Sequence, residues 1–459
     1  MGVPAGFRFG VATAGFQIEG GYNGPGQPAN NWGGWERAGR VEPSGKALGF
    51  WDGYEQQLDR AVAAGCDAFR LSVEWARVEP AEGAVDDTAL DRYAAILDAC
   101  GERGLEPLVT LHHFTHPAWL GEEFWLSVDA PERFAAWVTL AAGRLADRCR
   151  QWVTLNEINV LALQSYLTGV FPPGRRGATG ATVRALDHLL AAHVLAYGAV
   201  RAGRPDAVVA TNTFCLSVYE LDRLLTDVLL ARSKGLGRHD LGPWLEERRA
   251  DHYAALRRPS PLERALRRLG TASVPLDKAL PRAVAAVYDS PHARTLDVLQ
   301  LDWYDPVAAN HFRLPGHRTA GGRTWLPARM LWDDPVDAAG MAAWCRLNAR
   351  DGLPLWIVEN GLCNRVVDGR AYPRADGWDR VRYLEAHLAV VADMLDAGVD
   401  IGGYYHWTLA DNYEWGSYEP RFGLYGVDRG AAECWHDVDS MGGDAAGTYR
   451  RLIAHMRES

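Results

Sequence analysis

The chain alternates between short apolar runs and longer amphipathic stretches. Eight runs rich in β-branched and aromatic residues have the length of buried strands. They span residues 9–16, 66–75, 105–113, 152–157, 207–213, 296–304, 353–360 and 401–409. Residues 54–65, 131–148 and 378–398 have helical periodicity, and Gly398 is placed to end the last of these helices. Strands that alternate with helices predict a parallel sheet, and eight of them favour a closed (β/α)8 (TIM) barrel over an open doubly wound sheet.

The longest segment between two predicted strands runs from residue 214 to residue 295, between strands five and six. We interpret it as a solvated helical insertion that shapes the rim of the barrel. A membrane-binding amphipathic helix is the alternative, which the acidic charge of the whole chain disfavours. The sequence contains no internal repeat, low-complexity tract or linker, so we predict a single domain over residues 1–459.

The composition and charge of the chain limit the classes of molecule that it is expected to bind. With 48% hydrophobic and 23% charged residues, the chain is typical of a globular protein, and its net charge of −10 disfavours nucleic acid, which needs a basic face. No apolar run reaches the ~18 residues of a membrane span, and the first residues lack the pattern of a signal peptide. The seven cysteines form no CxxC pair, which favours a reducing compartment. We expect a cytoplasmic protein with a small-molecule partner and no membrane contact; the sequence gives no indication of its oligomeric state.

Polar and acidic residues gather where the predicted strands end. In a barrel these ends meet at one mouth. Glu157 ends strand four and Glu359, in the run WIVENG, ends strand seven, so the two side chains can face each other across a pocket. Glycoside hydrolysis needs two such carboxyl groups, one to protonate the leaving oxygen and one to attack the anomeric carbon or to activate water. The eighteen tryptophans suit the apolar faces of sugars.

Two other kinds of site are disfavoured. A nucleotide-binding protein should carry a GxGxxG or GxxxxGK[ST] turn after a strand, and neither is present. A phosphate-binding aldolase barrel should carry a glycine-rich phosphate loop or a Schiff-base lysine at a strand end, and the predicted strand ends contain no lysine.

Six motifs in order along nearly the whole chain resemble glycoside hydrolase family 1, the retaining β-glucosidase family of (β/α)8 barrels. They are FGVATAGFQIEG, FRLSVEWARVEP, LHHFTHPAWL, TLNE, IVENG and YYHWTLADNYEWGSYEPRFGLYGVD. Together they are far more specific than TLNE or ENG alone.

The resemblance implies a role for each carboxyl group. Glu157 of TLNE corresponds to the acid/base and Glu359 of IVENG to the nucleophile, with Arg70 and Tyr304 as partners of the nucleophile. We expect the carboxyl groups about 5–5.5 Å apart, as retention requires. Arg70 and the tyrosine should keep Glu359 ionised, and the nearby negative charge should raise the pKa of Glu157. No metal or organic cofactor is implied.

The same resemblance implies a set of substrate-binding residues. Asn156 corresponds to the amide that holds the sugar 2-hydroxyl, Trp407 to the platform under the ring and Phe422 to an aromatic wall, while the others grip the remaining hydroxyls. The set is Gln17, His113, Asn156, Trp407, Glu414, Trp415 and Phe422. Glu414 also argues against the 6-phosphosugar branch of the family, because a carboxylate there would repel phosphate.

One position departs from the pattern. The sixth strand reads QLDWY where the family often reads GINYY, so that Asp302 replaces an asparagine. This third carboxyl group near the site predicts either a raised carboxyl pKa or a preference for substrates with amino or other cationic groups. Glu19 and Glu74 are candidate extra acids for which we favour structural pairing. Four tryptophans could line an aglycone site or simply pack; they are Trp32, Trp35, Trp119 and Trp125.

The sequence therefore predicts a retaining β-glycosidase, most simply a β-glucosidase acting on small β-glycosides. A transglycosylase or a natural-product deglycosylase on the same scaffold is the first alternative, motivated by Asp302 and the insertion at residues 214–295. A sugar-binding pseudoenzyme is disfavoured, because both catalytic carboxyl groups are present.

Overall fold

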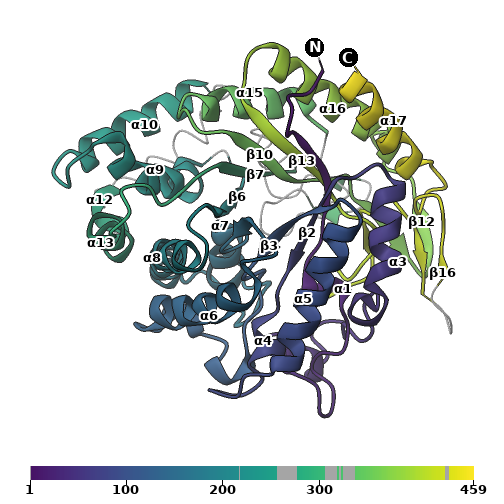
Figure 1. Ribbon diagram of the computed structural model, residues 1–459, viewed down its shortest axis with the longest axis horizontal. Helices are drawn as coiled ribbons and strands as arrows, with labels where there is room; N and C mark the ends of the chain where they lie inside the picture. The colour runs from purple at the N-terminus through teal and green to yellow at the C-terminus, as the bar shows by residue number, and fades with distance from the viewer. Residues whose placement is uncertain are drawn as a thin grey trace.

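The fold is a barrel of parallel strands surrounded by helices (Figure 1). We describe it from a computed structural model that covers residues 2–216, 218–255, 276–304, 318–319, 322–323, 336–429 and 434–458. Its strands follow the order β5-β4-β3-β2-β1-β13-β10-β7-β6. The bounds are β1 Arg8–Ala12, β2 Ala68–Ser72, β3 Glu106–Thr110, β4 Gln151–Val153, β5 Val208–Ala210, β6 Asn212–Phe214, β7 Leu299–Trp303, β10 Leu355–Asn360 and β13 Ile401–Trp407. The predicted (β/α)8 barrel is confirmed, and each of the eight predicted runs contains barrel strand.

The fifth predicted strand is divided in two. Its first half, β5, pairs with β4, and its second half, β6, pairs with β7. Thr211 lies between the halves, and its hydroxyl donates to the backbone carbonyl of Leu155 at 2.7 Å. The barrel therefore closes through one strand that changes its neighbour at a single residue.

Helices cover the outside of the barrel (Figure 1). The longer ones are α3 Phe50–Ala63, α5 Asp87–Glu102, α6 Ala130–Leu145, α8 Thr179–Gly203, α15 Ala338–Ala349, α16 Arg380–Asp396 and α17 Ala445–Glu458. The three predicted helices correspond to α3, α6 and α16. Gly398 follows α16 with a φ of +80°, a conformation that glycine adopts without strain, so it ends the helix as predicted.

The strands are buried because both of their faces pack against side chains. All six residues of β10 are buried, as expected for a parallel strand that lies between the barrel interior and a helical layer. Phe69 of β2 stacks on Phe50 of α3, with ring centroids 5.8 Å apart. Such contacts fix the strands, and therefore the residues at their ends, in a rigid frame.

The segment between β6 and β7 forms helices at one side of the barrel (Figure 1). They are α9 Arg223–Ala231, α10 Leu241–Ala255, α12 Leu276–Ala279 and α13 Pro281–Asp289, while residues 256–275 of the predicted insertion lie outside the described residues. Arg223 anchors this segment to the barrel, because its buried guanidinium donates to Asp351 at 2.7 Å and to Asn348 at 2.8 Å. The single domain over residues 1–459 and the insertion over 214–295 stay predictions.

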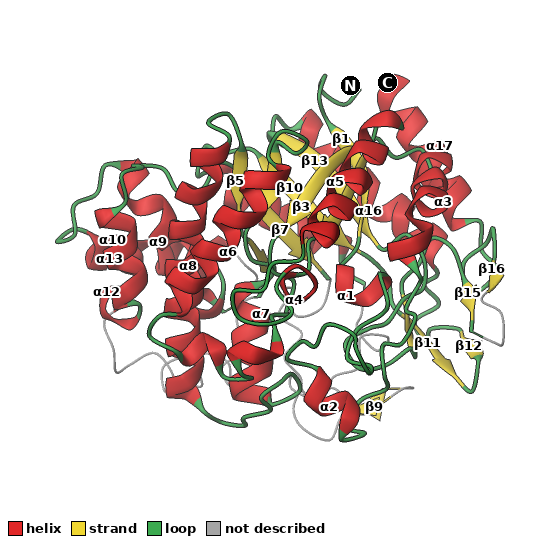
Figure 2. Cartoon of the chain, turned by 60° about the horizontal axis from the view of Figure 1, so that its bottom comes forward, coloured by secondary structure: helices red, strands yellow, loops and turns green. Residues whose placement is uncertain are grey.

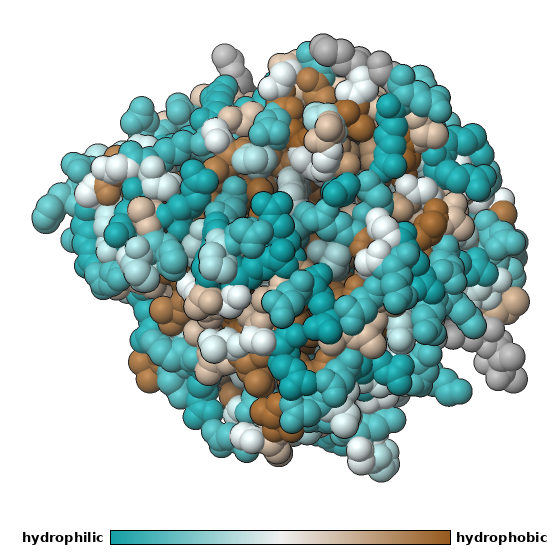
Figure 3. Space-filling view, in the orientation of Figure 1, coloured by the Kyte–Doolittle hydropathy of each residue, from teal (hydrophilic) through white to brown (hydrophobic). Residues whose placement is uncertain are grey.

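Shorter elements gather at the carboxyl-terminal ends of the strands. Figure 2 shows α1, α2, α7 and β11 at the end of the barrel away from the two termini. Their bounds, with those of the other short elements, are α1 Gly15–Ile18, α2 Gly33–Arg37, α4 Trp75–Val78, α7 Ile158–Ala162, β8 Arg318–Thr319, β9 Gly322–Arg323, β11 Asn364–Val367, β12 Arg370–Tyr372, β14 Pro420–Arg421, β15 Val427–Asp428 and β16 Cys434–Trp435. The face in Figure 3 is mostly hydrophilic, with apolar residues in small groups. None of the helices described here is long and apolar enough to cross a bilayer.

Candidate active site

The carboxyl end of β10 carries Glu359 into the barrel mouth. The next residue, Asn360, holds the strand: its side-chain amide donates to the carbonyl of Trp303 and to the hydroxyl of Tyr383, each at 2.8 Å, and accepts from Tyr404 at 2.6 Å. Gly361 follows because a Cβ there would lie 2.2 Å from the backbone oxygen of Trp407. The run ENG thus combines an acid with an amide that ties β10 to its neighbours and a glycine that permits close approach.

Two donors bind the carboxyl group of Glu359. Arg70 Nη1 lies 2.8 Å from Oε1, and the hydroxyl of Tyr304 lies 2.8 Å from Oε2. Burial raises the pKa of Glu359, while Arg70 and Tyr304 act in the opposite direction. The two partners therefore favour the charged form of Glu359 as expected, while burial disfavours it.

Glu157 lies just past β4, at the start of α7. Its φ of +39° is in the left-handed region, which is uncommon for a residue with a side chain and recurs at functional sites. Its backbone N–H donates to Asn212 Oδ1 at 3.2 Å. Burial, followed by the negative charges of Asp302 and Glu359, raises the pKa of Glu157 well above its ordinary value. Glu157 therefore holds its proton more tightly than an ordinary carboxyl group does, which is the property that a general acid needs.

Glu157, Asp302 and Glu359 form one buried cluster, each with a carboxyl oxygen within 4.8 Å of the others. The carboxyl groups therefore approach more closely than the ~6.5–9.5 Å of inverting glycosidases, as expected for a retaining one. The three oxygens are close enough to hold a metal ion. However, Arg70 already brings a positive charge to within 2.8 Å of Glu359 and 3.9 Å of Asp302.

Arg70 of β2 connects several strand ends. It has no exposed surface, and it donates to Thr110 Oγ1 and to the carbonyl of Val358, each at 3.2 Å. Its Nη2 also donates to Asn156 Oδ1, which accepts a second bond from Asn212 at 2.9 Å. These two donors fix the orientation of the amide, and its nitrogen has no partner among the described residues, so it can donate to a ligand.

The predicted substrate-binding residues also lie together. Glu414 Oε1 accepts from Trp407 Nε1 at 2.9 Å, and the side-chain amide of Gln17 donates to the carbonyl of the preceding residue, Tyr413, at 2.6 Å. His113 stacks against Trp407 and Trp415, with centroids 5.8 Å and 5.7 Å away. The resulting surface offers rings beside a carboxyl group and an amide, a combination suited to a sugar.

The ionisation of these polar groups is set by their burial. Burial raises the pKa of Glu414 to about 8, and it lowers the pKa of His113 well below its ordinary value, so that the imidazole is neutral. Gln17 Oε1 and His113 Nδ1 have no partner in the described part of the protein. Phe422 completes the wall, with its ring 6.0 Å from that of Tyr304 at 80°.

Sequence reasoning missed Asn212. This residue begins β6, and it contacts the backbone of Glu157 and the side chains of Asn156 and Asp302. It lies at the end of the fifth predicted run, residues 207–213, so the rule applied to the other strand ends would have found it. Phe214 was also missed; its ring stacks on Tyr304 with centroids 5.5 Å apart.

The two candidate extra acids, Glu19 and Glu74, are held by hydrogen bonds from neighbouring side chains, as predicted. Glu19 accepts from Arg77 at 2.9 Å and from Tyr93 at 2.8 Å. Glu74 accepts from the hydroxyls of Ser72 and Thr115, at 2.7 Å and 2.5 Å. Both carboxyl groups are therefore held by neighbouring side chains and lie outside the cluster around Arg70.

Four tryptophans were candidates either for lining an aglycone site or for simple packing. Three of them are buried, namely Trp32, Trp35 and Trp125. Trp32 packs against Trp415 with ring centroids 5.5 Å apart, so it supports the sugar-facing wall from behind. Trp119 is partly exposed, and its indole N–H donates to the carbonyl of Glu79 at 2.9 Å.

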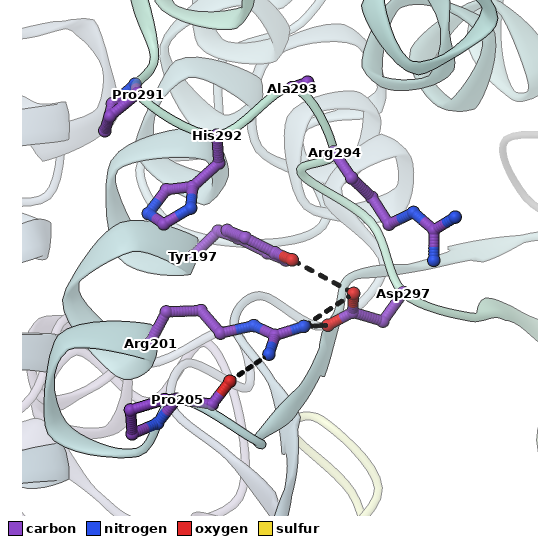
Figure 4. Close-up of a pocket in the computed structure, with 8 residues that line it drawn as sticks. All are labelled: Tyr197, Arg201, Pro205, Pro291, His292, Ala293, Arg294 and Asp297. Carbon is purple, nitrogen blue, oxygen red and sulfur yellow. Dashed lines mark hydrogen bonds and ion pairs between the residues drawn. The ribbon is translucent and has the colours of Figure 1, made fainter.

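A cavity of about 490 Å³ lies elsewhere, at the amino-terminal ends of β5 and β7. Figure 4 shows Arg201 and Tyr197 pointing toward Asp297, and both side chains bind its carboxylate at 3.0 Å. Asp297 also accepts from the backbone N–H of Val209 at 2.9 Å. These groups satisfy one another and join the two strands, so this cavity is structural.

Comparisons with known proteins agree with the geometry at the barrel mouth. The model of glycosyl hydrolase family 1 matches residues 2–250 and 324–439. A bifunctional β-D-glucosidase/β-D-fucosidase from Bifidobacterium breve is 29% identical, over 98% of both chains. A 6-phospho-β-galactosidase from Lacticaseibacillus rhamnosus is 27% identical, over 93% of this chain and 94% of its own. The structure of a Thermotoga maritima β-glucosidase in complex with castanospermine superposes with a TM-score of 0.73 over 99% of both chains, at 22% identity.

Proposed function

Because this chain belongs to glycosyl hydrolase family 1, and is therefore a glycoside hydrolase of a β-glycosidase family, we propose that it is a retaining β-glucosidase acting on small β-glycosides. The observation that carries the proposal is the pair of buried carboxyl groups of Glu157 and Glu359, with oxygens within 4.8 Å of each other. One group has a raised pKa, while the other is bound by Arg70 and Tyr304.

The first step forms a glycosyl-enzyme. Glu359, charged and held by Arg70, attacks the anomeric carbon, and Glu157 gives its proton to the glycosidic oxygen as that bond breaks. The amide nitrogen of Asn156, which has no partner in the part of the chain that the structure describes, supports this step, because it can donate to the 2-hydroxyl as charge develops on the sugar.

The second step releases the sugar. Glu157, now a carboxylate, takes a proton from a water molecule whose oxygen attacks the anomeric carbon, and Glu359 leaves as a carboxylate. Each step inverts the anomeric carbon, so the product keeps the β configuration. The chain supplies every acid, base and nucleophile that these steps need.

The glycone, the sugar that is cleaved from the substrate, differs among the relatives of this chain. The Bifidobacterium breve relative is named for both glucoside and fucoside activity, and the Lacticaseibacillus rhamnosus relative for a 6-phosphogalactoside. Glu414 favours an unphosphorylated sugar here. Its hydrogen-bond partner among the described residues is Trp407, which is not a cation and so does not supply the positive charge that a phosphate group needs.

A panel of nitrophenyl β-glycosides tests the proposal, with glucoside, galactoside, fucoside, xyloside, mannoside, glucosaminide and glucoside 6-phosphate. We expect the glucoside to rank first and the 6-phosphate to be cleaved poorly. Product distribution in the presence of an acceptor alcohol separates hydrolysis from transglycosylation. Absence of turnover on every glycoside would contradict the proposal.

Glu359→Gly identifies the nucleophile. We expect it to lose activity by about four orders of magnitude, and added azide to restore turnover with an α-glycosyl azide as product. Glu82→Gly is the matched control, because Glu82 is exposed and binds Arg133. Azide rescue that gives only β-glycosyl azide would show that Glu359 is not the nucleophile.

A further inference from the structure

Asp302 distinguishes this site from the family pattern. It lies in β7, opposite Glu359 of β10 in the strand register. Its side chain has no exposed surface, whereas Glu157 and Glu359 are 5% and 4% exposed. The groups nearest to the carboxyl oxygens of Asp302 are Asn212 and the carboxyl groups of Glu157 and Glu359, so its most direct effect is on those two carboxyl groups.

The groups around Asp302 come from β2, β6 and β10 and from the residues that follow β4, β6 and β7. Asn212 of β6 donates to its Oδ2, while Oδ1 has no hydrogen-bond partner in the described structure. Arg70 of β2 is 3.9 Å from Oδ1, too far for a hydrogen bond, and its Nη1 is engaged by Glu359. The other titratable groups that face it are Glu157, Glu359, Tyr304 and Cys215.

The carboxyl groups of Asp302 and Glu157 have oxygens within 4.8 Å of each other, and each contains a buried oxygen that no donor among the described residues reaches. Two carboxylates cannot bond to each other unless one of them carries a proton. Arg70 supplies one positive charge to three buried carboxyl groups, and it is in direct contact with Glu359. The remaining pair is therefore stable when it holds one proton and one negative charge.

Resting on the function proposed above, we infer that Asp302 and Glu157 share one proton, and that Asp302 is a positioning residue that makes Glu157 a weaker acid and a stronger base. An asparagine at this position would lack the second carboxylate.

The charges balance through both steps. In the first step the shared proton goes to the leaving oxygen, the bond from that oxygen to the anomeric carbon breaks, and Glu359 forms an ester. The negative charge lost at Glu359 reappears on the Glu157–Asp302 pair, so the net charge of the cluster does not change. In the second step a proton from water returns to the pair, and Glu359 leaves as a carboxylate. Asp302 thus opposes the first proton transfer and favours the second.

Asp302→Asn tests the inference because the shapes of the two side chains are nearly equal. We expect the basic limb of kcat/KM against pH to move to lower pH by about one unit, because Glu157 loses a negative neighbour. Release of the sugar should slow relative to its transfer to Glu359. An unchanged basic limb, or a shift to higher pH, would overturn the inference.

Two further variants test whether a shift of the basic limb arises from the pairing of Asp302 with Glu157. Asn212→Ala removes the donor to Asp302 Oδ2, so its basic limb should move the opposite way, to higher pH; an unchanged or lowered limb contradicts the inference even if Asp302→Asn does not fold. Glu74→Gln is the control, because it replaces another buried acid whose contacts are with Ser72 and Thr115, and its basic limb should match wild type.

Infrared titration of protonated carboxyl groups supplies a readout that does not need turnover. We expect Asp302→Asn to lower the titration midpoint of the band that Glu157→Gln removes, and an equal midpoint would contradict proton sharing. If wild type cleaves no glycoside but this midpoint shifts, the proposed function fails while the shared proton stands. If wild type is active and neither the limb nor the midpoint moves, only the inference fails.

Discussion

Arg70 and Glu359 face each other across the barrel interior, with 2.8 Å between Nη1 and Oε1. The contact joins β2 to β10, strands that are separated by 289 positions in sequence at these residues. The same guanidinium also binds Thr110, Val358 and Asn156. One cation therefore both balances the charge of Glu359 and fixes its position relative to Asn156.

Arg70→Lys separates these two roles, because lysine keeps the charge and loses the planar set of donors. We expect kcat/KM to fall about 10²- to 10³-fold with little change in the acid limb of its pH profile. Arg133→Lys, at an exposed ion pair, is the control. Wild-type activity in Arg70→Lys would show that the charge alone is sufficient.

Tyr304→Phe removes one of the two donors to Glu359. The hydroxyl lowers the pKa of Glu359, so its loss should move the acid limb of kcat/KM to higher pH and reduce the rate about tenfold. The ring should stay in place, because it stacks on Phe214. A rate profile across acidic pH checks the direction, and a shift to lower pH would be inconsistent with the assigned hydrogen bond.

Glu157→Ala should affect substrates according to their leaving group. Dinitrophenolate leaves without a proton, so formation of the glycosyl-enzyme from its glycoside should persist, whereas alkyl glycosides should lose about 10²- to 10⁴-fold in rate. Azide should then restore release of the sugar as the β-glycosyl azide, because it attacks the intermediate from the face that Glu157 occupied. Equal losses for both kinds of leaving group would argue against Glu157 as the acid.

Glu74 predicts a pH dependence of stability. Burial raises the pKa of Glu74 from 4.5 to about 7, so between these values the unfolded chain releases a proton that the folded protein retains. The contribution of Glu74 to stability is therefore fully present below pH 4.5 and is lost as pH rises to about 7. Glutamine does not titrate, so the Glu74→Gln variant does not lose this contribution to stability as pH rises. The stability of wild type relative to the variant should thus fall by up to about 3 kcal/mol across the window in denaturant titrations. A constant difference would contradict the shift.

The barrel could be predicted from the sequence because each of its eight buried strands corresponds to a short apolar run in the sequence. Runs such as 105–113 and 353–360 contain continuously apolar segments, at 107–109 and 353–358, since the strands in these runs are covered on both faces. Strand bounds were less accurate, because apolar residues continue past the last ladder hydrogen bond into the mouth. His113, for example, belongs to a predicted strand but follows the end of β3 at Thr110.

The division of the fifth strand was not predictable in the same way. Residues 207–213 are a uniform run, and the change of neighbour at Thr211 depends on how β4 and β7 are spaced around the barrel. The bond from Arg70 to Asn156 was likewise invisible, because it joins residues 86 positions apart through side chains that meet only after the barrel closes. Motifs identify such residues, but their mutual contacts follow from the closed fold.

The closed ring of strands contains one strand, the fifth predicted one, whose two halves pair with different neighbours. Thr211 is the residue at which the ladder passes from β4 to β7, and these strands precede Glu157 and carry Asp302. The spacing between the carboxyl groups of Glu157 and Asp302 is therefore set where the fifth strand changes its neighbour, at a residue that carries no charge and lies outside the set that is expected to meet the sugar.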